Sequence, residues 1–186
     1  MIRTPAIWPL RPHRDCDAVP LDRLEVKSVR TAPLQWRFCF GGAGDTARVR
    51  FPSPETSSRG DGLWKHTCCE VFLMDDGGRY CEFNFSPSTQ WAAYRFDSYR
   101  SGMKAQGLAS APRIEFTRTP DLFVLDAEVD LTGVFEAQAR SLRMGLAAVI
   151  EHSDGEISYW ALAHAPGKPD FHYANSFVGV LRDNGS

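Results

Sequence analysis

The chain has 186 residues, of which 43% are hydrophobic, and a formal net charge of −2 at pH 7. This length can bury one core of ordinary size but is short for two separate cores, so we expect a single domain over residues 1–186. The charge balance gives neither the basic excess typical of nucleic-acid binding nor the acidic excess of a solvating tail.

The N-terminal segment interrupts its apolar residues with three prolines between Met1 and Pro12, so it lacks the apolar core of a signal peptide. No later stretch approaches the roughly 20 apolar residues of a membrane span. The five cysteines show neither a C-x-x-C pair nor a zinc-ligand spacing, which indicates reduced thiols. We therefore expect a cytoplasmic protein that binds neither a membrane nor a nucleic acid.

Runs in which apolar residues recur at every second position, bounded by Pro, Gly, Asp and Ser, predict β-strands along the whole chain. The predicted strands cover residues 24–30, 34–40, 46–51, 68–74, 80–86, 91–97, 113–119, 122–130, 141–151, 157–163 and 177–181. A short connecting helix is predicted over 131–140, with Thr132 as its cap. The pattern indicates an all-β fold, an antiparallel β-sandwich of jelly-roll-like type.

The register of the hairpin formed by 68–74 and 80–86 can be argued from its apolar residues. These must share a face, which favours a five-residue connection that pairs Met74 with Tyr80. Two further cross-strand pairs then follow, Glu70 with Asn84 and Phe72 with Glu82.

The strand over 91–97 is expected to extend this face. Taking Ala92, Tyr94 and Phe96 as its apolar set requires Ser86 to lie opposite Trp91. Arg95 then faces Glu82, and Ala93 faces Asn84.

The predicted face combines flat apolar rings with fixed polar groups, which is what sugar recognition requires. The alternative interpretation is that this face is solvated and carries ordinary cross-strand pairs. We predict that the face binds a small molecule, most simply a sugar, through Glu70, Phe72, Glu82, Asn84, Ser86, Trp91 and Arg95.

Several segments carry a resemblance to a known family. They are DGLWKHTC at 61–68, EVFL at 70–73, EFNFSPS at 82–88, WAAY at 91–94, YR at 99–100, YWALAH at 159–164 and KPDFH at 168–172. In these segments the chain resembles the DOMON-like domains of bacterial proteins, which are related to family 9 carbohydrate-binding modules. The resemblance implies a β-sandwich whose ligand is a sugar or a heme, with calcium or heme as the cofactor.

Two other classes of function stay open. A heme- or metal-binding domain would use His66, His164, His172 or Met103 as axial ligands, and His164, Asp170 and His172 are the weaker candidates for a metal site. A module that assembles through exposed aromatic residues is the other class, and the sequence leaves the oligomeric state undetermined.

Glu70 and Glu82 have the residue types of a glycosidase acid/base pair, and cross-strand neighbours two positions out of register lie about 7–8 Å apart. With Arg95 beside it, however, Glu82 would stay ionised and would be a poor general acid. We therefore predict no catalytic residue and favour a binding protein over an enzyme.

Overall fold

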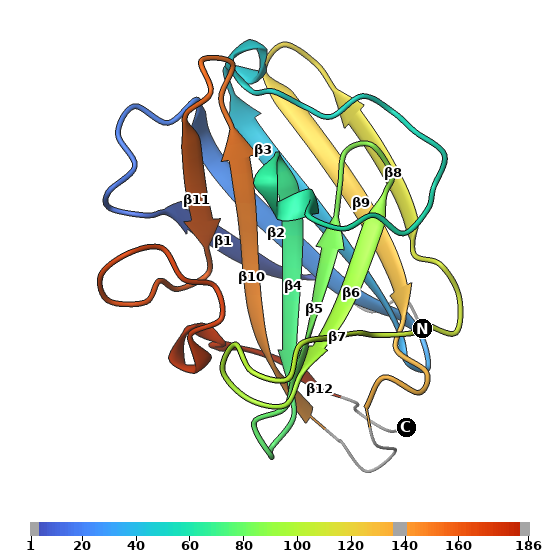
Figure 1. The fold of residues 1–186 in the computed structure, drawn as a ribbon. Coiled ribbons are helices and arrows are strands. Elements are labelled where there is room, and N and C mark those ends of the chain that lie inside the picture. Colours follow the sequence, from blue (N-terminus) through green and yellow to red (C-terminus); the bar gives the residue numbers. More distant parts are fainter. Residues whose placement is uncertain (1–3, 136–140, 183–186) are drawn as a thin grey trace.

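Figure 1 shows the computed structural model, which describes residues 4–135 and 141–182. The pairings between its strands are antiparallel. The strands are β1 (Ala6–Pro12), β2 (Leu21–Ala32), β3 (Gln35–Gly44), β4 (Cys68–Met74), β5 (Tyr80–Phe85), β6 (Trp91–Phe96), β7 (Lys104–Ala105), β8 (Arg113–Arg118), β9 (Leu122–Asp130), β10 (Ser141–Glu151), β11 (Ile157–Ala161) and β12 (Gly179–Arg182). Three 3-10 turns connect them, η1 (Thr46–Arg48), η2 (Leu63–Lys65) and η3 (Ala174–Ser176).

The strands form two sheets that lie face to face (Figure 1). One sheet has the order β1-β2-β3-β9-β8, and the other has the order β7-β6-β5-β4-β10-β11, with β12 on the free side of β10. Strand β1 links the sheets, because residues 6–10 pair with β2 whereas residues 11–12 pair with β11. The all-β antiparallel sandwich predicted from the sequence is confirmed.

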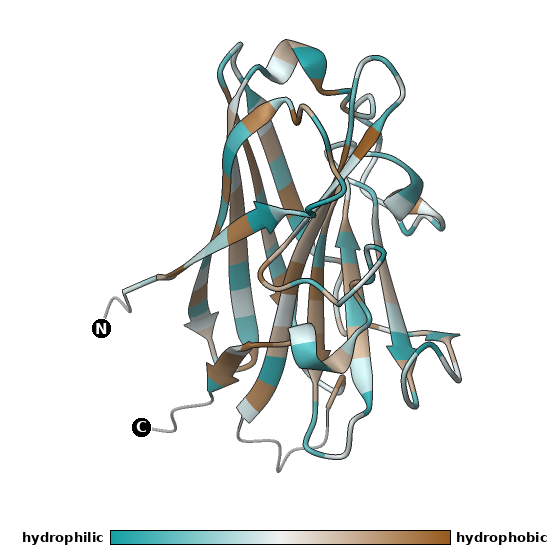
Figure 2. Cartoon of the chain, turned by 90° about the vertical axis from the view of Figure 1, so that its left-hand side faces the viewer, coloured by the Kyte–Doolittle hydropathy of each residue, from teal (hydrophilic) through white to brown (hydrophobic). Residues whose placement is uncertain are grey.

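The main core lies between the two sheets and follows from alternation along the strands. In β9, every second residue is buried, from Phe123 through Leu125 and Ala127 to Val129. Bands of hydrophobic and hydrophilic residues alternate in the same way along the strands in Figure 2. These side chains meet the apolar face of the opposite sheet, and this burial is the main source of the sandwich's stability.

The sheet that contains β4 and β5 is buried on both faces, since every residue of these two strands is buried. Its second face carries an apolar cluster that includes Phe72, Tyr80, Phe96 and Phe177. Phe177 packs over β10 at Gly145, where a Cβ atom would lie 2.7 Å from its ring. The C-terminal segment thus covers part of the outer face of this sheet.

Three element predictions need correction. Residues 46–51 are not a strand, because Asp45 accepts a hydrogen bond from the Ala47 amide and starts the turn η1, and only Val49 forms a bridge, to His152. Strand β1 was not predicted because its prolines argue against a strand. The structure tolerates them because each half of β1 pairs on one side only.

The predicted helix over 131–140 is also not observed where it can be tested. Residues 131–135 form turns, with Gly133 at a φ of 74°, and 136–140 lie outside the described residues. Among the described residues, no helix is long and apolar enough to cross a membrane.

Candidate functional site

The outer face of β4 and β5 carries two carboxyl groups and an amide. Alternation places Glu70, Glu82 and Asn84 there, while Val71 and Phe83 point into the main core. The register between the two strands is as predicted, with Glu70 opposite Asn84 and Phe72 opposite Glu82. The two glutamates are therefore diagonal neighbours on adjacent strands.

These carboxyl groups form part of the lining of a cavity of about 330 Å³. Its remaining walls are mostly aromatic and come from segments far apart in the sequence. The lining residues are Trp64, Glu70, Glu82, Phe96, Arg100, Met103, Val149, Tyr159, Pro169, Phe171 and His172.

Trp64 stands at the more exposed part of this lining. It is 37% exposed and makes an edge contact with Tyr94, with ring centroids 5.8 Å apart. It belongs to the 3-10 turn η2, which follows Gly62 with its φ of 74° and directly precedes β4. In contrast, Phe96 is buried and stacks on Tyr80 at 4.6 Å. The cavity thus has one aromatic ring exposed to solvent and a second held rigidly within the fold.

The two glutamates differ in the hydrogen-bond partners of their carboxyl groups. Glu70 is 3% exposed, and its Oε1 atom has no hydrogen-bond partner among the described residues. Glu82 is 5% exposed, and its Oε1 accepts a hydrogen bond of 2.7 Å from Asn84 Nδ2. Burial, with the nearby Glu82 carboxylate as a second cause, raises the pKa of Glu70 well above its ordinary value.

The pKa of Glu82 is also raised by burial, although the Asn84 hydrogen bond and the charge of Arg100 oppose the shift. Asn84 itself is fully buried, and its Oδ1 lies 3.6 Å from the donor Cys68 Sγ. Its amide therefore orients Glu82 and does not extend into the cavity lining.

His172 closes one wall of the cavity and is held by Tyr80. The Tyr80 hydroxyl accepts a hydrogen bond from the Arg100 amide and lies 2.9 Å from His172 Nδ1. The other ring nitrogen, Nε2, lies 3.7 Å from Glu82 Oε2. Burial lowers the pKa of His172 to about 4, so this is a contact between a neutral imidazole and a carboxyl group and not an ion pair at neutral pH.

Arg100, the arginine of the lining, is fixed by Asp170. Its Nη2 lies 2.8 Å from Asp170 Oδ1, and the Tyr99 hydroxyl donates to Asp170 Oδ2 at 2.6 Å. These interactions lower the pKa of Asp170 despite its burial. The C-terminal segment that carries Pro169, Phe171 and His172 is thereby pinned to the loop that carries Arg100.

The predicted register between β5 and β6 is wrong by one residue. Trp91 pairs with Phe85 and Arg95 with Cys81, whereas Tyr94 lies opposite Glu82. A shift of one residue reverses the face of every side chain, so Trp91 and Arg95 lie on the face away from Glu82. Arg95 is exposed and does not neutralise Glu82. The expectation that Arg95 makes Glu82 a poor general acid therefore does not hold.

Two other predicted ligand-binding residues also lie outside the cavity lining. Phe72 is on the outer face but is buried against His172 and Phe177. Ser86 is buried at the end of the hairpin, where its hydroxyl accepts a hydrogen bond from Ser88. Of the seven predicted residues, only Glu70 and Glu82 line the cavity.

Sequence reasoning missed most of the walls. Trp64, Arg100, Tyr159 and Phe171 all fall within the segments that resemble DOMON-like domains, but alternation along a hairpin gave them no role. The available signal was the resemblance itself, since the segments at 61–68, 99–100, 159–164 and 168–172 each contribute to the lining.

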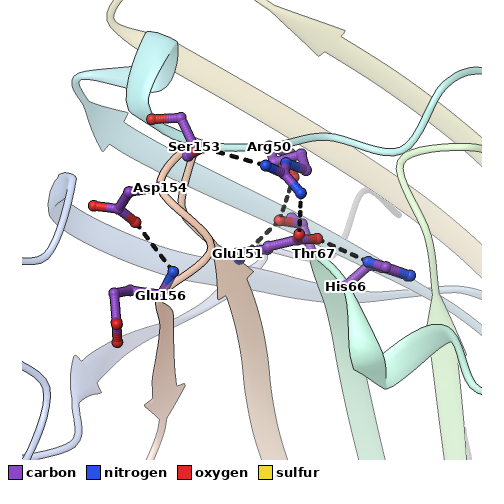
Figure 3. Close-up of polar contacts among 7 residues, drawn as sticks. All are labelled: Arg50, His66, Thr67, Glu151, Ser153, Asp154 and Glu156. Atoms are coloured by element: carbon purple, nitrogen blue, oxygen red, sulfur yellow. Dashed lines mark hydrogen bonds and ion pairs between the residues drawn. The ribbon is translucent and has the colours of Figure 1, made fainter.

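Figure 3 shows a different arrangement of a buried carboxylate on the same sheet. Glu151 at the end of β10 contacts Arg50 Nη1 at 2.9 Å and His66 Nδ1 at 2.8 Å. Its amide donates to Thr67 Oγ1, which donates in turn to the carbonyl of Arg50. This carboxylate ties β10 to the segment before β4, and it lines a second pocket of about 620 Å³ together with Ser86.

The candidate metal and heme ligands do not form a metal site. No group of three or more His, Cys, Asp or Glu side chains within residues 4–135 and 141–182 could hold a metal ion. His164 bonds to the Arg11 carbonyl, Asp170 is engaged by Arg100, and both nitrogens of His172 face protein groups. Met103 lines the same cavity as His172, whose two ring nitrogens face protein groups, whereas His66 contacts Glu151 and lines the second pocket. These residues therefore do not present a pair of axial ligands for heme iron.

No protein-family model and no curated protein matches this sequence. Among solved structures, the chain is similar to a protein from Bacteroides uniformis whose name proposes that it binds carbohydrate, with 12% identity, a TM-score of 0.70 and coverage of 96% of this chain and 86% of that one.

It is also similar to a family 9 carbohydrate-binding module from Caldicellulosiruptor kristjanssonii. The complex of that module with cellotriose has 11% identity, a TM-score of 0.51 and coverage of 94% and 82% of the two chains. The glucose complex has 11% identity, a TM-score of 0.48 and coverage of 86% and 75%. At these identities the likeness to the first two structures shows the fold alone, an antiparallel β-sandwich.

Proposed function

We propose that this protein binds a small carbohydrate in the cavity that Glu70 and Glu82 line. The observation that carries the proposal is the Glu70 carboxyl group, which lines an aromatic-walled cavity and whose Oε1 has no hydrogen-bond partner in the described chain. Sugar hydroxyls donate hydrogen bonds to such oxygens, and the C–H faces of a sugar ring pack on aromatic side chains.

The size of the cavity favours a small ligand. Its volume of about 330 Å³ is near the lower end of the range for small-molecule sites, roughly 300–1,000 Å³. We therefore expect a monosaccharide, or the terminal unit of a longer chain that projects past Trp64. The names of two similar folds, a carbohydrate-binding protein and a module in complex with cellotriose, support a ligand of this class.

The proposal includes the family and the location. The segments at 61–68, 82–88 and 159–172 supply most of the cavity lining, which supports assignment to the DOMON-like domains. A cytoplasmic location, expected from the N-terminal segment, is part of the same proposal and can be tested by cell fractionation.

Calorimetric titration with glucose and cellotriose tests the function. A ligand at 100 times its Kd adds about 2.7 kcal/mol, which raises the Tm by roughly 5–10 °C in a chain of this size. Trp64→Ala should weaken binding at least tenfold while leaving the Tm of the free protein nearly unchanged. Leu122→Ala is the matched control, because Leu122 is 41% exposed on the other sheet. The absence of any sugar binding, or full binding by Trp64→Ala, would overturn the proposal.

A further inference from the structure

We infer that the cavity prefers an amino sugar, a carbohydrate that carries an ammonium group, over the corresponding neutral sugar. The inference rests on the proposed carbohydrate function and names the class of ligand. It follows from the balance of charges in the cavity lining.

The acidic side of that balance is the diagonal pair on β4 and β5. Glu70 and Glu82 both line the cavity and are nearly inaccessible to bulk solvent. The Asn84 amide donates to Glu82, but Glu70 Oε1 has no donor among the described residues. A buried carboxylate without a donor or a counter-ion is costly, so burial raises the pKa of Glu70 and the free protein keeps a proton there. An ammonium group bound at this carboxyl group would release that proton and supply the missing counter-ion.

The side chains of the lining that could carry a positive charge do not compensate Glu70. Among the described lining residues the cationic candidates are Arg100 and His172. Arg100 forms its ion pair with Asp170 at 2.8 Å. His172 is neutral at pH 7, because burial lowers its pKa to about 4. Neither one supplies a full positive charge to Glu70.

Glu151 shows that this fold supplies partners to a buried carboxylate elsewhere. It lies on the same sheet, and Arg50 and His66 contact its two oxygens at 2.9 and 2.8 Å (Figure 3). Glu151 is a carboxylate with its partners supplied by the chain. Glu70, of similar burial, faces the cavity without such partners, as expected if the ligand supplies the cation.

An ammonium group matches this arrangement better than a hydroxyl. It presents three donors, enough to reach Glu70 and Glu82 together, whereas a hydroxyl presents one. Hydrogen bonds between charged partners are about twice as strong as neutral ones, and the partly exposed Trp64 ring in the lining is of the type that best attracts cations. The remaining ring atoms would pack on the apolar walls as those of a neutral sugar do.

The test is calorimetric titration of the full chain at pH 6 and 150 mM salt. Glucosamine, galactosamine and mannosamine are each compared with the neutral parent sugar, and N-acetylglucosamine is added as an uncharged nitrogen derivative. At least one amino sugar should bind ten or more times tighter than its parent and than the acetylated form. Glu70→Gln should reduce that ratio to about twofold or less.

Glu115→Gln is the matched control, because Glu115 is an exposed glutamate of β8, and it should keep the full preference. If neutral sugars bind and no amino sugar exceeds its parent, the inference fails and the proposed function stands. If no sugar binds, both fail. If methylammonium binds as tightly as the amino sugars, the site recognises a bare cation, and the carbohydrate proposal is overturned.

Discussion

The sheet formed by β4, β5 and β6 has two faces that differ in composition, although every residue of β4 and β5 is buried on either face. The face toward the second sheet carries Val71, Phe83 and Ala93, whereas the opposite face carries Glu70 and Glu82 among its aromatic residues. The inner face meets a sheet whose buried side chains are mainly apolar, so most polar groups there would have no partner. The outer face meets loops and a cavity. Burial alone therefore does not separate the residues that build this fold from those that offer a site.

The largest effect that tests this comparison is expected on the inner face. Phe83 is completely buried, so Phe83→Ala should lower the free energy of unfolding by about 3–5 kcal/mol through lost transfer energy and a new void. Phe171→Ala, on the cavity wall, should cost less than about 2 kcal/mol because Phe171 is only half-buried. Urea denaturation measures both. Equal losses would show that the two faces do not differ in this way.

Trp91→Ala is the next test, since the register places Trp91 with the inner face. The residue is half-buried against the main core, and its Nε1 has no hydrogen-bond partner within the described residues. We expect a loss of about 2–3 kcal/mol and unchanged sugar affinity. A stable variant that no longer binds sugar would instead return Trp91 to the ligand site.

The error at Trp91 shows what sequence alternation can determine. The β4–β5 register was predicted correctly because one pairing aligns two apolar sets across a short turn. In residues 91–96, aromatic residues occupy both parities, since Trp91 falls on one and Tyr94 and Phe96 on the other. With both faces buried, hydrophobicity cannot choose between the two registers.

The walls of the cavity were beyond local reasoning for a different reason. Tyr159, Phe171 and His172 line the same cavity as Glu82 but come from segments far from it in the sequence, so no periodicity near residue 82 indicates them. The class of fold, in contrast, depends on many short strands with turns between them, and that pattern is legible in the sequence. The fold and the two glutamates on β4 and β5 could be predicted from the sequence, whereas the other residues that line the cavity could not.

Glu70→Gln is expected to stabilise the free protein, and the effect should depend on pH. The pKa of Glu70 is raised on folding, so the native state holds a proton that the unfolded chain has released. The contribution of Glu70 to the free energy of unfolding is therefore most favourable below pH 4.5, the ordinary pKa of the group. It falls as the pH rises toward the higher pKa that Glu70 has in the folded state. The Glu70→Gln variant does not lose stability in this way. Its free energy of unfolding should exceed that of the unchanged protein by about 1 kcal/mol at pH 8 and by almost nothing at pH 4. Chemical denaturation at both pH values measures the difference, and a destabilised variant at pH 8 would mean that Glu70 is ionised and paired.

Arg95→Ala should have the smallest effect, and that small effect separates the observed register from the predicted one. In the predicted register Arg95 opposes Glu82, so its removal would leave a buried carboxylate without its cation, a change that costs about 3–5 kcal/mol. In the structure Arg95 is exposed opposite Cys81 and Lys104, and surface substitutions of this kind stay within about 0.5 kcal/mol. Sugar affinity should also be unchanged, because Arg95 does not line the cavity with Glu82. Thermal unfolding and calorimetry of the same variant measure both quantities, and a large loss in either would place Arg95 on the face of the two glutamates.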